Sequence, residues 1–284
     1  MAATGPFADA SVTAIVGLMS NSIAFNLAAL AALVPASLLP LRRNGSRDGL
    51  FWGLLGLAIA GPLLWVLGQI SGSWQTNLST DLWVGVAASL VLFAGIAAFH
   101  RQAWRLTPLM MPYMMLLGLM ASLFGYATGK PLASDAPAGW LDLHIVVSII
   151  TLGLLTVAAS AALASFLQAR ALKVKRPNSL TRMLPAVSES DRLFERLLVL
   201  SEIVLGLGVV SGMATQYDET GSLLSMNHKT LFSLMAFGII GLLLVGRRVC
   251  GVRGQMAARV ALLAYSLVIL GYFGVKFVKQ VLLS

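Results

Sequence analysis

The sequence predicts an all-α protein that crosses a membrane about eight times. Hydrophobic residues make up 58% of the chain, charged residues only 11%, and the mean hydropathy is +0.85. A soluble domain of 284 residues with this composition would have too little polar surface. Apolar runs of about 20 residues recur along the chain, and this is the length of a membrane-spanning helix. Together these observations predict a polytopic helical bundle.

Eight apolar runs are expected to span the membrane. They cover roughly residues 12–39, 50–70, 82–99, 108–126, 144–168, 195–215, 228–246 and 257–281. Because these runs take up most of the chain, residues 1–284 are predicted to form a single integral membrane domain. The fifth run is rich in small residues, which predicts close backbone contact with another helix.

The lysine and arginine residues indicate the orientation in the membrane. Sixteen of the 20 fall in the loops that follow the first, third, fifth and seventh runs. Loops rich in Lys and Arg stay in the cytoplasm, so both termini are expected on the opposite, outer side. The formal net charge of +9 therefore reflects topology and contact with anionic lipid, and no nucleic-acid partner is expected.

Two of the three histidines stand at the start of long apolar runs. His144 begins the fifth run and His228 the seventh, each just after a polar loop. Both runs enter from the outer side, so the two imidazoles are expected at similar depth. Neutral imidazoles are common axial ligands of haem iron. The pattern predicts a haem b site in which His144 and His228 bind the metal through the haem iron.

Charged and polar residues near the two histidines fit this site. Lys229, Lys276 and Lys279 are predicted at the outer surface, where they would contact the haem propionates. Asp142 and Asn227 are close enough in sequence to orient the imidazoles by hydrogen bonds. Zinc is disfavoured, because two histidines without a nearby cysteine do not complete a closed site. In the alternative, both histidines only cap helices and no cofactor binds.

Several short motifs resemble a known family in their order along the chain. They are His144-Ile-Val-Val-Ser148, Leu184-Pro185, Asp191-Arg-Leu-Phe194, Ser211-Gly212, His228-Lys-Thr230, Gly246-Arg247, Gly251-Val-Arg-Gly254 and Tyr272-Phe-Gly-Val-Lys-Phe277. From about residue 140 to the C-terminus the chain resembles the cytochrome c assembly membrane-protein family, which includes the CcsA and CcmC haem-handling proteins. It looks most like the YpjD/HemX-like branch. The first four runs agree only in hydropathy and number.

The resemblance implies an eight-helix haem-handling protein of the bacterial inner membrane, with its termini on the periplasmic side. It also implies partners among cytochrome c maturation proteins or other inner-membrane proteins. In the CcsA and CcmC branches, two external histidines flank a tryptophan-rich WWD loop, and His144 and His228 fall where that pair would be. Here Trp140 is isolated and the tryptophan-rich loop is missing. Delivery of haem to an apocytochrome is therefore in question even if haem binds.

Two functions without haem stay open. A HemX-like membrane scaffold or regulator would act through loop 170–196 or the external loops. A small-solute transporter would need a polar path that includes Asn21, Asn26 and Glu202. The sequence contains no serine-hydrolase, phosphate-loop or paired-carboxylate arrangement, so the chain is not expected to be an enzyme.

Two other titratable residues have plain explanations. Glu202 lies inside the sixth run and is expected to extend toward Arg196 or another cytoplasmic arginine, although an intramembrane carboxylate is also a functional candidate. His100, beside Arg101 at the end of the third run, is expected to be an interfacial residue. The single cysteine, Cys250, excludes an intramolecular disulfide, and no C-x-x-C-H motif for covalent haem attachment is present.

Overall fold

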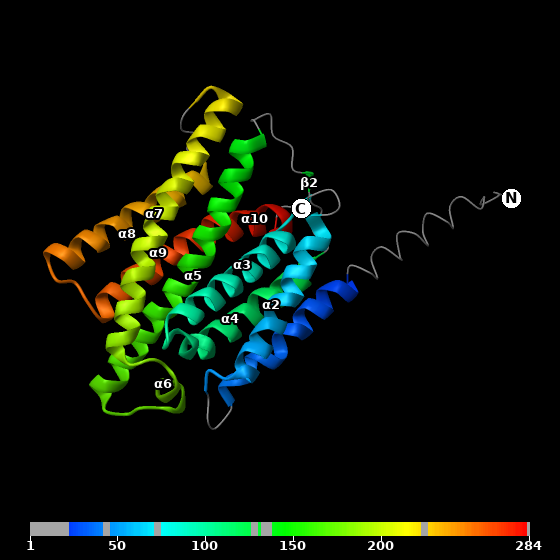
Figure 1. The fold of residues 1–284 in the computed structure, drawn as a ribbon. Helices are drawn as coiled ribbons and strands as arrows, with labels where there is room; N and C mark the ends of the chain where they lie inside the picture. The colour runs from blue at the N-terminus through cyan, green and yellow to red at the C-terminus, as the bar shows by residue number, and fades with distance from the viewer. Residues whose placement is uncertain are drawn as a thin grey trace.

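The computed structural model describes residues 23–41, 46–70, 75–125, 130–131, 138–222 and 227–282. Within these residues the fold is a bundle of long helices that pack side by side (Figure 1). The long helices are α2 (Gly49–Ile70), α3 (Leu78–Phe99), α4 (Thr107–Leu123), α5 (Ala138–Val174), α7 (Val187–Thr220), α8 (His228–Val249) and α9 (Gln255–Ile269). The predicted polytopic all-α fold is therefore confirmed.

The described part of the chain contains seven helices that are long and apolar enough to cross a membrane, α4 being counted with the turn before it and α9 with its continuation. The helical residues Ile23–Ser37 form a shorter apolar segment in front of them. This agrees with the predicted eight spans. The beginning of the first run, with Asn21 and Ser22, lies outside the described residues.

Short elements connect the long helices. They are the 3-10 turns η1 (Leu39–Leu41) and η2 (Ala103–Leu106), the short helix α6 (Ser179–Met183) and the strands β1 (Gln75–Thr76) and β2 (Lys130–Pro131), which pair antiparallel. Helix α9 continues through the π-helical turn η3 (Leu270–Gly274), α10 (Val275–Phe277) and a second π-helical turn, η4 (Val278–Leu282). Such π-helical turns often mark functional segments; Lys279 lies in η4, and Lys276 lies in α10 between the two π-helical turns.

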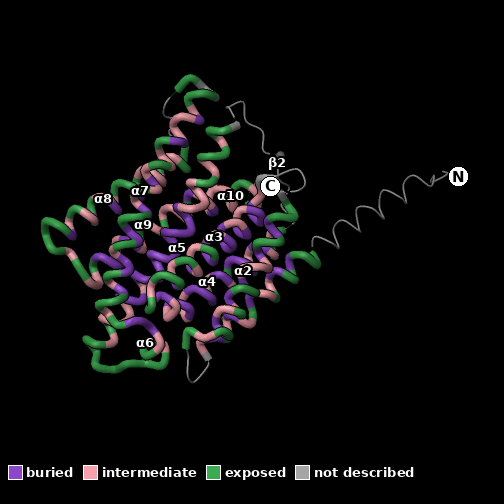
Figure 2. The backbone as a smooth tube through the Cα atoms, in the orientation of Figure 1, coloured by how far each residue is buried: buried purple, intermediate pink, exposed green. Residues whose placement is uncertain are grey.

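The packed core lies around α3 and α5. In the most apolar stretch of α5, 67% of the residues are buried, against 17% in α8. Figure 2 shows the same contrast, with buried residues concentrated in the middle of the bundle. A Cβ added to Gly153 on α5 would lie 2.5 Å from Leu92 Cδ1 and 3.3 Å from the backbone of Ala88 on α3. The small residues of the fifth run thus allow the predicted close helix contact.

Polar groups inside the bundle form hydrogen bonds between helices. The Trp83 indole N–H donates to Asn26 Oδ1 at 2.7 Å, which joins the segment Ile23–Ser37 to α3. The Tyr265 hydroxyl is 2.8 Å from that of Tyr113 and 3.0 Å from that of Thr156, which links α9, α4 and α5. Such bonds satisfy groups that hydrocarbon cannot. Asn26 is therefore part of the packing between helices.

The loops rich in arginine lie together at one end of the bundle, which we call the basic end. Arg47 donates to the Ala98 carbonyl at 3.1 Å, and Arg105 to the Met183 carbonyl at 3.1 Å. Helix α6 lies at this end as well (Figure 1). These bonds connect the loops after the first, third and fifth runs, so these runs end on the same side, as the sequence predicts.

Candidate functional site

His144 lies near the start of α5, at the end of the bundle opposite the basic end. Helix α5 has 37 residues and α7 has 34, so at 1.5 Å per residue both exceed the hydrocarbon thickness of about 30 Å. In Figure 1 the first turns of α5 and the last turns of α7 project beyond the other helices. His144 meets α7 at Ser211, about 22 Å of helix from Arg196 near the basic end. The imidazole therefore lies about 10 Å of helix before Asp218, where the apolar part of α7 ends.

Hydrogen bonding to Ser211 and to the Gly208 backbone of α7 orients the His144 ring. His144 Nδ1 lies 3.0 Å from Ser211 Oγ, while the Ser211 hydroxyl donates to the Gly208 carbonyl at 3.1 Å. Since the serine proton is committed to Gly208, Ser211 Oγ accepts a hydrogen bond from the Nδ1–H of the neutral ring. Nε2 is then the nitrogen with the free lone pair. This tautomer is the one in which Nε2 serves as a metal ligand.

A glycine makes the space for this ring. A Cβ added to Gly212 would lie 2.9 Å from His144 Cε1 and 3.4 Å from His144 Nδ1. The imidazole therefore packs directly against the backbone of α7, and a side chain at position 212 would displace it. Gly208, Ser211 and Gly212 form a small-residue face on α7 that receives the half-buried His144.

His228 is the first residue of α8, and its side chain is exposed. Its neighbour Lys229 has its ammonium 5.7 Å from the centre of the Tyr272 ring, in cation–π geometry. Lys229 is also within electrostatic range of His144. The structure therefore brings the start of α8 to the same end of the bundle as His144. Among the described residues, no hydrogen bond joins His144 to His228.

The predicted propionate contacts have different surroundings. Lys276 forms an ion pair with Asp81 near the start of α3, and both side chains are largely buried. Its charge is already balanced, so a propionate at this position would compete with Asp81. Lys279 is exposed one turn further on, and Lys229 lies within electrostatic range of both lysines. Lys229 and Lys279 are thus the more available cations of the three.

The two residues predicted to orient the imidazoles lie at the surface. Asp142 is exposed and forms no hydrogen bond to either histidine among the described residues. Asn227 is exposed and is the N-cap residue of α8. The residue that orients His144 is Ser211, to which the sequence reasoning gave no role. A signal was present, because residues 208, 211 and 212 follow the i, i+3, i+4 spacing of a tight helix contact.

Glu202 and His100 lie away from this site. A Cβ added to Gly241 of α8 would lie 3.1 Å from Glu202 Oε1. The other carboxylate oxygen of Glu202, Oε2, is buried and has no hydrogen-bond partner among the described residues. The carboxylate therefore packs against α8 and does not pair with Arg196, contrary to the expectation. His100 follows the last residue of α3, at the basic end. The described residues also contain no group of three His, Cys, Asp or Glu side chains that would hold a metal ion directly.

The fold and this site define a multi-pass membrane protein with two histidines at one end of its helix bundle. Residues 82–283 match the family of cytochrome C assembly proteins. The chain belongs to this family. The match begins in α3. It therefore starts well before residue 140, from which the short motifs predicted the resemblance.

A relative in Azospirillum brasilense is similar over almost the whole chain. It is described as an uncharacterized 28.8 kDa protein in the nifR3-like 5'region. The two are 51% identical over 271 residues, which cover 94% of this chain and all of the relative. The similarity therefore includes the first helices as well as the part shared with the family.

Proposed function

We propose that this protein binds haem b near the periplasmic surface of the bacterial inner membrane and handles haem in cytochrome c biogenesis. His144 and His228 are the proposed axial ligands. The observation that carries the proposal is the hydrogen bond from His144 Nδ1 to Ser211, which leaves Nε2 with its lone pair. Membership of the cytochrome c assembly family supports a role in haem handling or cytochrome c biogenesis.

The residues at this end of the bundle fit a haem group. His144 is a neutral, oriented imidazole beside apolar helix surface, and His228 is a second imidazole on an exposed helix start. Lys229 and Lys279 offer positive charge for the propionates, with Lys276 shared with Asp81. When bound, haem supplies an iron that is either carried as cargo or cycled between its ferrous and ferric states. The proposal assigns binding and no catalytic step to the chain.

The proposed side of the membrane follows from the positive-inside rule. The basic end would face the cytoplasm, and the histidines would face the periplasm. Cys250 and a Gly139→Cys change made in a Cys250→Ser background provide the test, since both positions are exposed. In intact cells, a membrane-impermeant maleimide should label the cysteine at position 139 and leave Cys250 unlabelled. The reverse labelling would contradict the proposed orientation.

The haem site is tested by purifying the protein after expression with added haem and recording oxidised and reduced visible spectra. A low-spin spectrum at one haem per chain is expected, and both His144→Ala and His228→Ala should lose it. His100→Ala is the matched control, because His100 is the remaining histidine of the chain and lies at the basic end. It should retain the spectrum.

Two results would contradict the haem proposal. The first is a folded wild-type protein that takes up no haem. The second is a haem spectrum that survives both substitutions. The first result would favour the alternative of a HemX-like scaffold or regulator that acts through protein partners. Capture of cytochrome c maturation proteins or other inner-membrane proteins would then test that function, and it would also bear on the predicted YpjD/HemX-like branch.

A further inference from the structure

A carboxyl group without a partner lies where α7 contacts α8, in the half of the bundle nearer the basic end. Glu202 is part of the apolar stretch of α7, six residues and about 9 Å of helix beyond Arg196. Its Oε2 is buried and accepts no hydrogen bond from any described residue, and its Oε1 packs against α8 at Gly241. The proposed haem site is at the other end of these helices, so Glu202 requires its own explanation.

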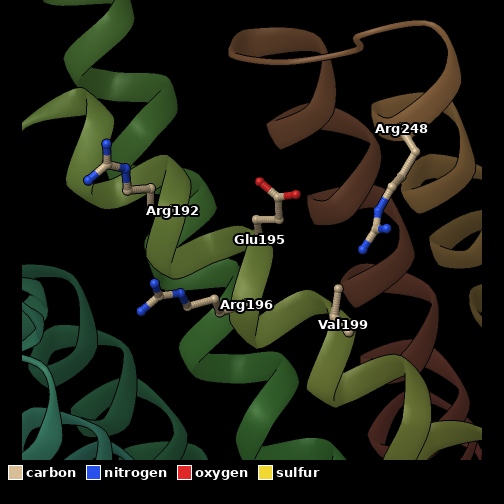
Figure 3. A pocket seen from close by; sticks show the side chains of 5 residues that line it. All are labelled: Arg192, Glu195, Arg196, Val199 and Arg248. Carbon is tan, nitrogen blue, oxygen red and sulfur yellow. The ribbon is translucent and has the colours of Figure 1, made fainter.

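A hollow between α7 and α8 starts at the basic end and reaches the turn of α7 before Glu202. Its volume is about 380 Å³, and it is lined by Arg192, Glu195, Arg196, Val199 and Arg248. Figure 3 shows Glu195 and Val199 on the side of α7 that faces Arg248, whereas the side chains of Arg192 and Arg196 point to the other side. Glu202 follows Val199 by three residues, so it is the next side chain on the face of α7 that borders the hollow.

The spacing of residues on the two helices aligns Glu202 with Arg248. Glu195 and Glu202 are seven residues apart on α7, and Gly241 and Arg248 are seven apart on α8, which is about two turns in each case. Since the helices are antiparallel and Glu202 meets Gly241, Glu195 lies at the level of Arg248. Arg248 forms no ion pair with any residue that the structure describes. A free cation therefore lies on the same side of the helix pair as Glu202.

The other titratable side chains of the neighbouring helices are engaged elsewhere. Arg247 of α8 is paired with two carboxylates near the start of α7. Residues 145–169 of α5, which packs on α7, include no ionisable side chain. On α9, Arg259 lies 5.5 Å from the centre of a phenylalanine ring of α5, and Tyr265 bonds to hydroxyl groups of α4 and α5. Arg248 is thus the cation that remains for Glu202.

These surroundings favour a neutral carboxyl group at Glu202. A carboxylate without a partner is strongly disfavoured in hydrocarbon, whereas the neutral acid is tolerated there. The hollow admits water from the basic end to within about one turn of the carboxyl group. When the O–H bond breaks, its electron pair stays on the carboxyl oxygen and the proton passes to this water. The carboxylate that is left then needs a cation, and Arg248 is in position to supply it.

We infer that Glu202 is a proton-binding site, which exchanges its proton with water at the basic end through the hollow between α7 and α8. In the protonated form the neutral carboxyl group packs against Gly241. In the deprotonated form it pairs with Arg248 and adds an ion pair between the two helices. The contact between α7 and α8 therefore responds to the proton concentration at the basic end.

Infrared spectroscopy tests the inference, because a protonated carboxyl group has a carbonyl band that a carboxylate lacks. The full chain is purified in dodecyl maltoside, which contains no carbonyl group, and spectra are recorded at about pH 6 and about pH 9. Ordinary exposed Asp and Glu residues are ionised at both values. At the lower pH, Glu202→Gln should remove a band equal to one carboxyl group per chain. In the wild type this band should fall about tenfold at the higher pH. Glu189→Gln, at an exposed position of the same helix, is the control and should retain the band.

Two arginine variants test the role of the hollow. Arg248→Gln removes the cation that pairs with the deprotonated form, so at the higher pH the Glu202 band should be at least about twice as strong as in the wild type. Arg196→Gln removes the same charge on the other side of α7 and should leave the band as in the wild type. Both arginines are exposed, so both variants should fold.

Three results would overturn the inference. If Glu202→Gln removes no band, Glu202 carries no proton at either pH. If the Glu202 band is equally strong at both pH values, the residue is a neutral acid that does not exchange its proton in this range. If Arg248→Gln and Arg196→Gln have the same effect, the proton is not linked to the hollow. None of these measurements involves haem, so their outcome is independent of the haem proposal.

Discussion

The two ends of helix α7 make different kinds of contact with their neighbours. At the basic end, α7 is joined to α8 by charge, because the buried Arg247 pairs with both Asp191 and Glu195. At the other end, α7 contacts α5 through a neutral hydrogen bond and a glycine, at Ser211 and Gly212, which hold His144. The ion pairs hold this end in one geometry, because removal of the buried cation would leave two carboxylates unpaired and would destabilise the protein. The neutral contact holds an imidazole in place and leaves one of its nitrogens free.

The largest effect is expected for Arg247→Met. The Arg247 side chain is 2% exposed, so its loss leaves Asp191 and Glu195 facing each other without a cation. Because both carboxylates are partly exposed, we expect the free energy of unfolding to fall by about 2–3 kcal/mol, below the full cost of a fully buried pair. Unfolding in mixed detergent and SDS micelles, followed by tryptophan fluorescence, measures it. Arg248→Met is the control and should cost less than about 0.5 kcal/mol.

If Arg247→Met and Arg248→Met have the same effect, the ion pairs do not join α7 to α8. A double Asp191→Asn/Glu195→Gln change in the Arg247→Met background should restore part of the stability, since the unpaired negative charges are gone.

Gly212→Ala tests the contact at the other end. The added Cβ would lie 2.9 Å from His144 Cε1, so the ring must move, and a loss of about 2 kcal/mol in the free energy of unfolding is expected. Gly208→Ala is a control on the same helix, because its Cβ would meet Val147 Cγ1 at an ordinary 3.5 Å. The control should be neutral or slightly stabilising, since alanine favours helix. Equal stability of the two variants would contradict the packing of His144 on Gly212.

Asp81→Asn tests the second charged contact at the histidine end. It leaves the largely buried Lys276 without its carboxylate partner, and we expect a loss of about 1–2 kcal/mol. Asp142→Asn removes an exposed carboxylate at the same end and should have almost no effect on unfolding. If Asp81→Asn leaves the free energy of unfolding unchanged, the ion pair contributes no stability and Lys276 is as available as Lys229.

The smallest effect is expected for Ser211→Ala. The change removes the acceptor of the His144 Nδ1 proton, and a neutral hydrogen bond contributes about 1 kcal/mol. Ser266→Ala is the control, because the exposed Ser266 donates only to the Leu262 carbonyl of its own helix. Under the haem proposal, Ser211→Ala should also shift the visible spectrum, since the orienting hydrogen bond of the ligand is lost. An unchanged spectrum in a haem-loaded variant would remove Ser211 from the proposed site.

Some features of the site could be predicted from the sequence and others could not. The start of a long apolar run places His144 and His228 at helix starts, and α8 indeed begins at His228. The partner of His144 could not be predicted, because Ser211 is 67 residues away and only helix packing brings it close. Asp142 was the nearer candidate in sequence, but two residues along a helix separate side chains by more than half a turn.

The ends of the helices could likewise be predicted only in part from the sequence. The predicted runs 144–168 and 195–215 are shorter than α5 and α7, which span Ala138–Val174 and Val187–Thr220. Hydropathy marks only the stretch that lies in hydrocarbon, whereas helical hydrogen bonds continue into the interface and beyond. Likewise, the lysines near the C-terminus were predicted to contact haem propionates, and only the packing of α10 on α3 pairs Lys276 with Asp81.

By itself, the sequence determined that this is an all-α protein with about eight membrane spans, with basic loops on one side and with the motifs of the cytochrome c assembly family. These properties depend on the length and polarity of single segments, which the bilayer selects one helix at a time. The tertiary structure decided which residues meet: Ser211 with His144, Asp81 with Lys276, and Arg247 with Asp191 and Glu195. Such contacts depend on how helices distant in sequence rotate and pack against one another, and the hydropathy of a segment carries no information about that.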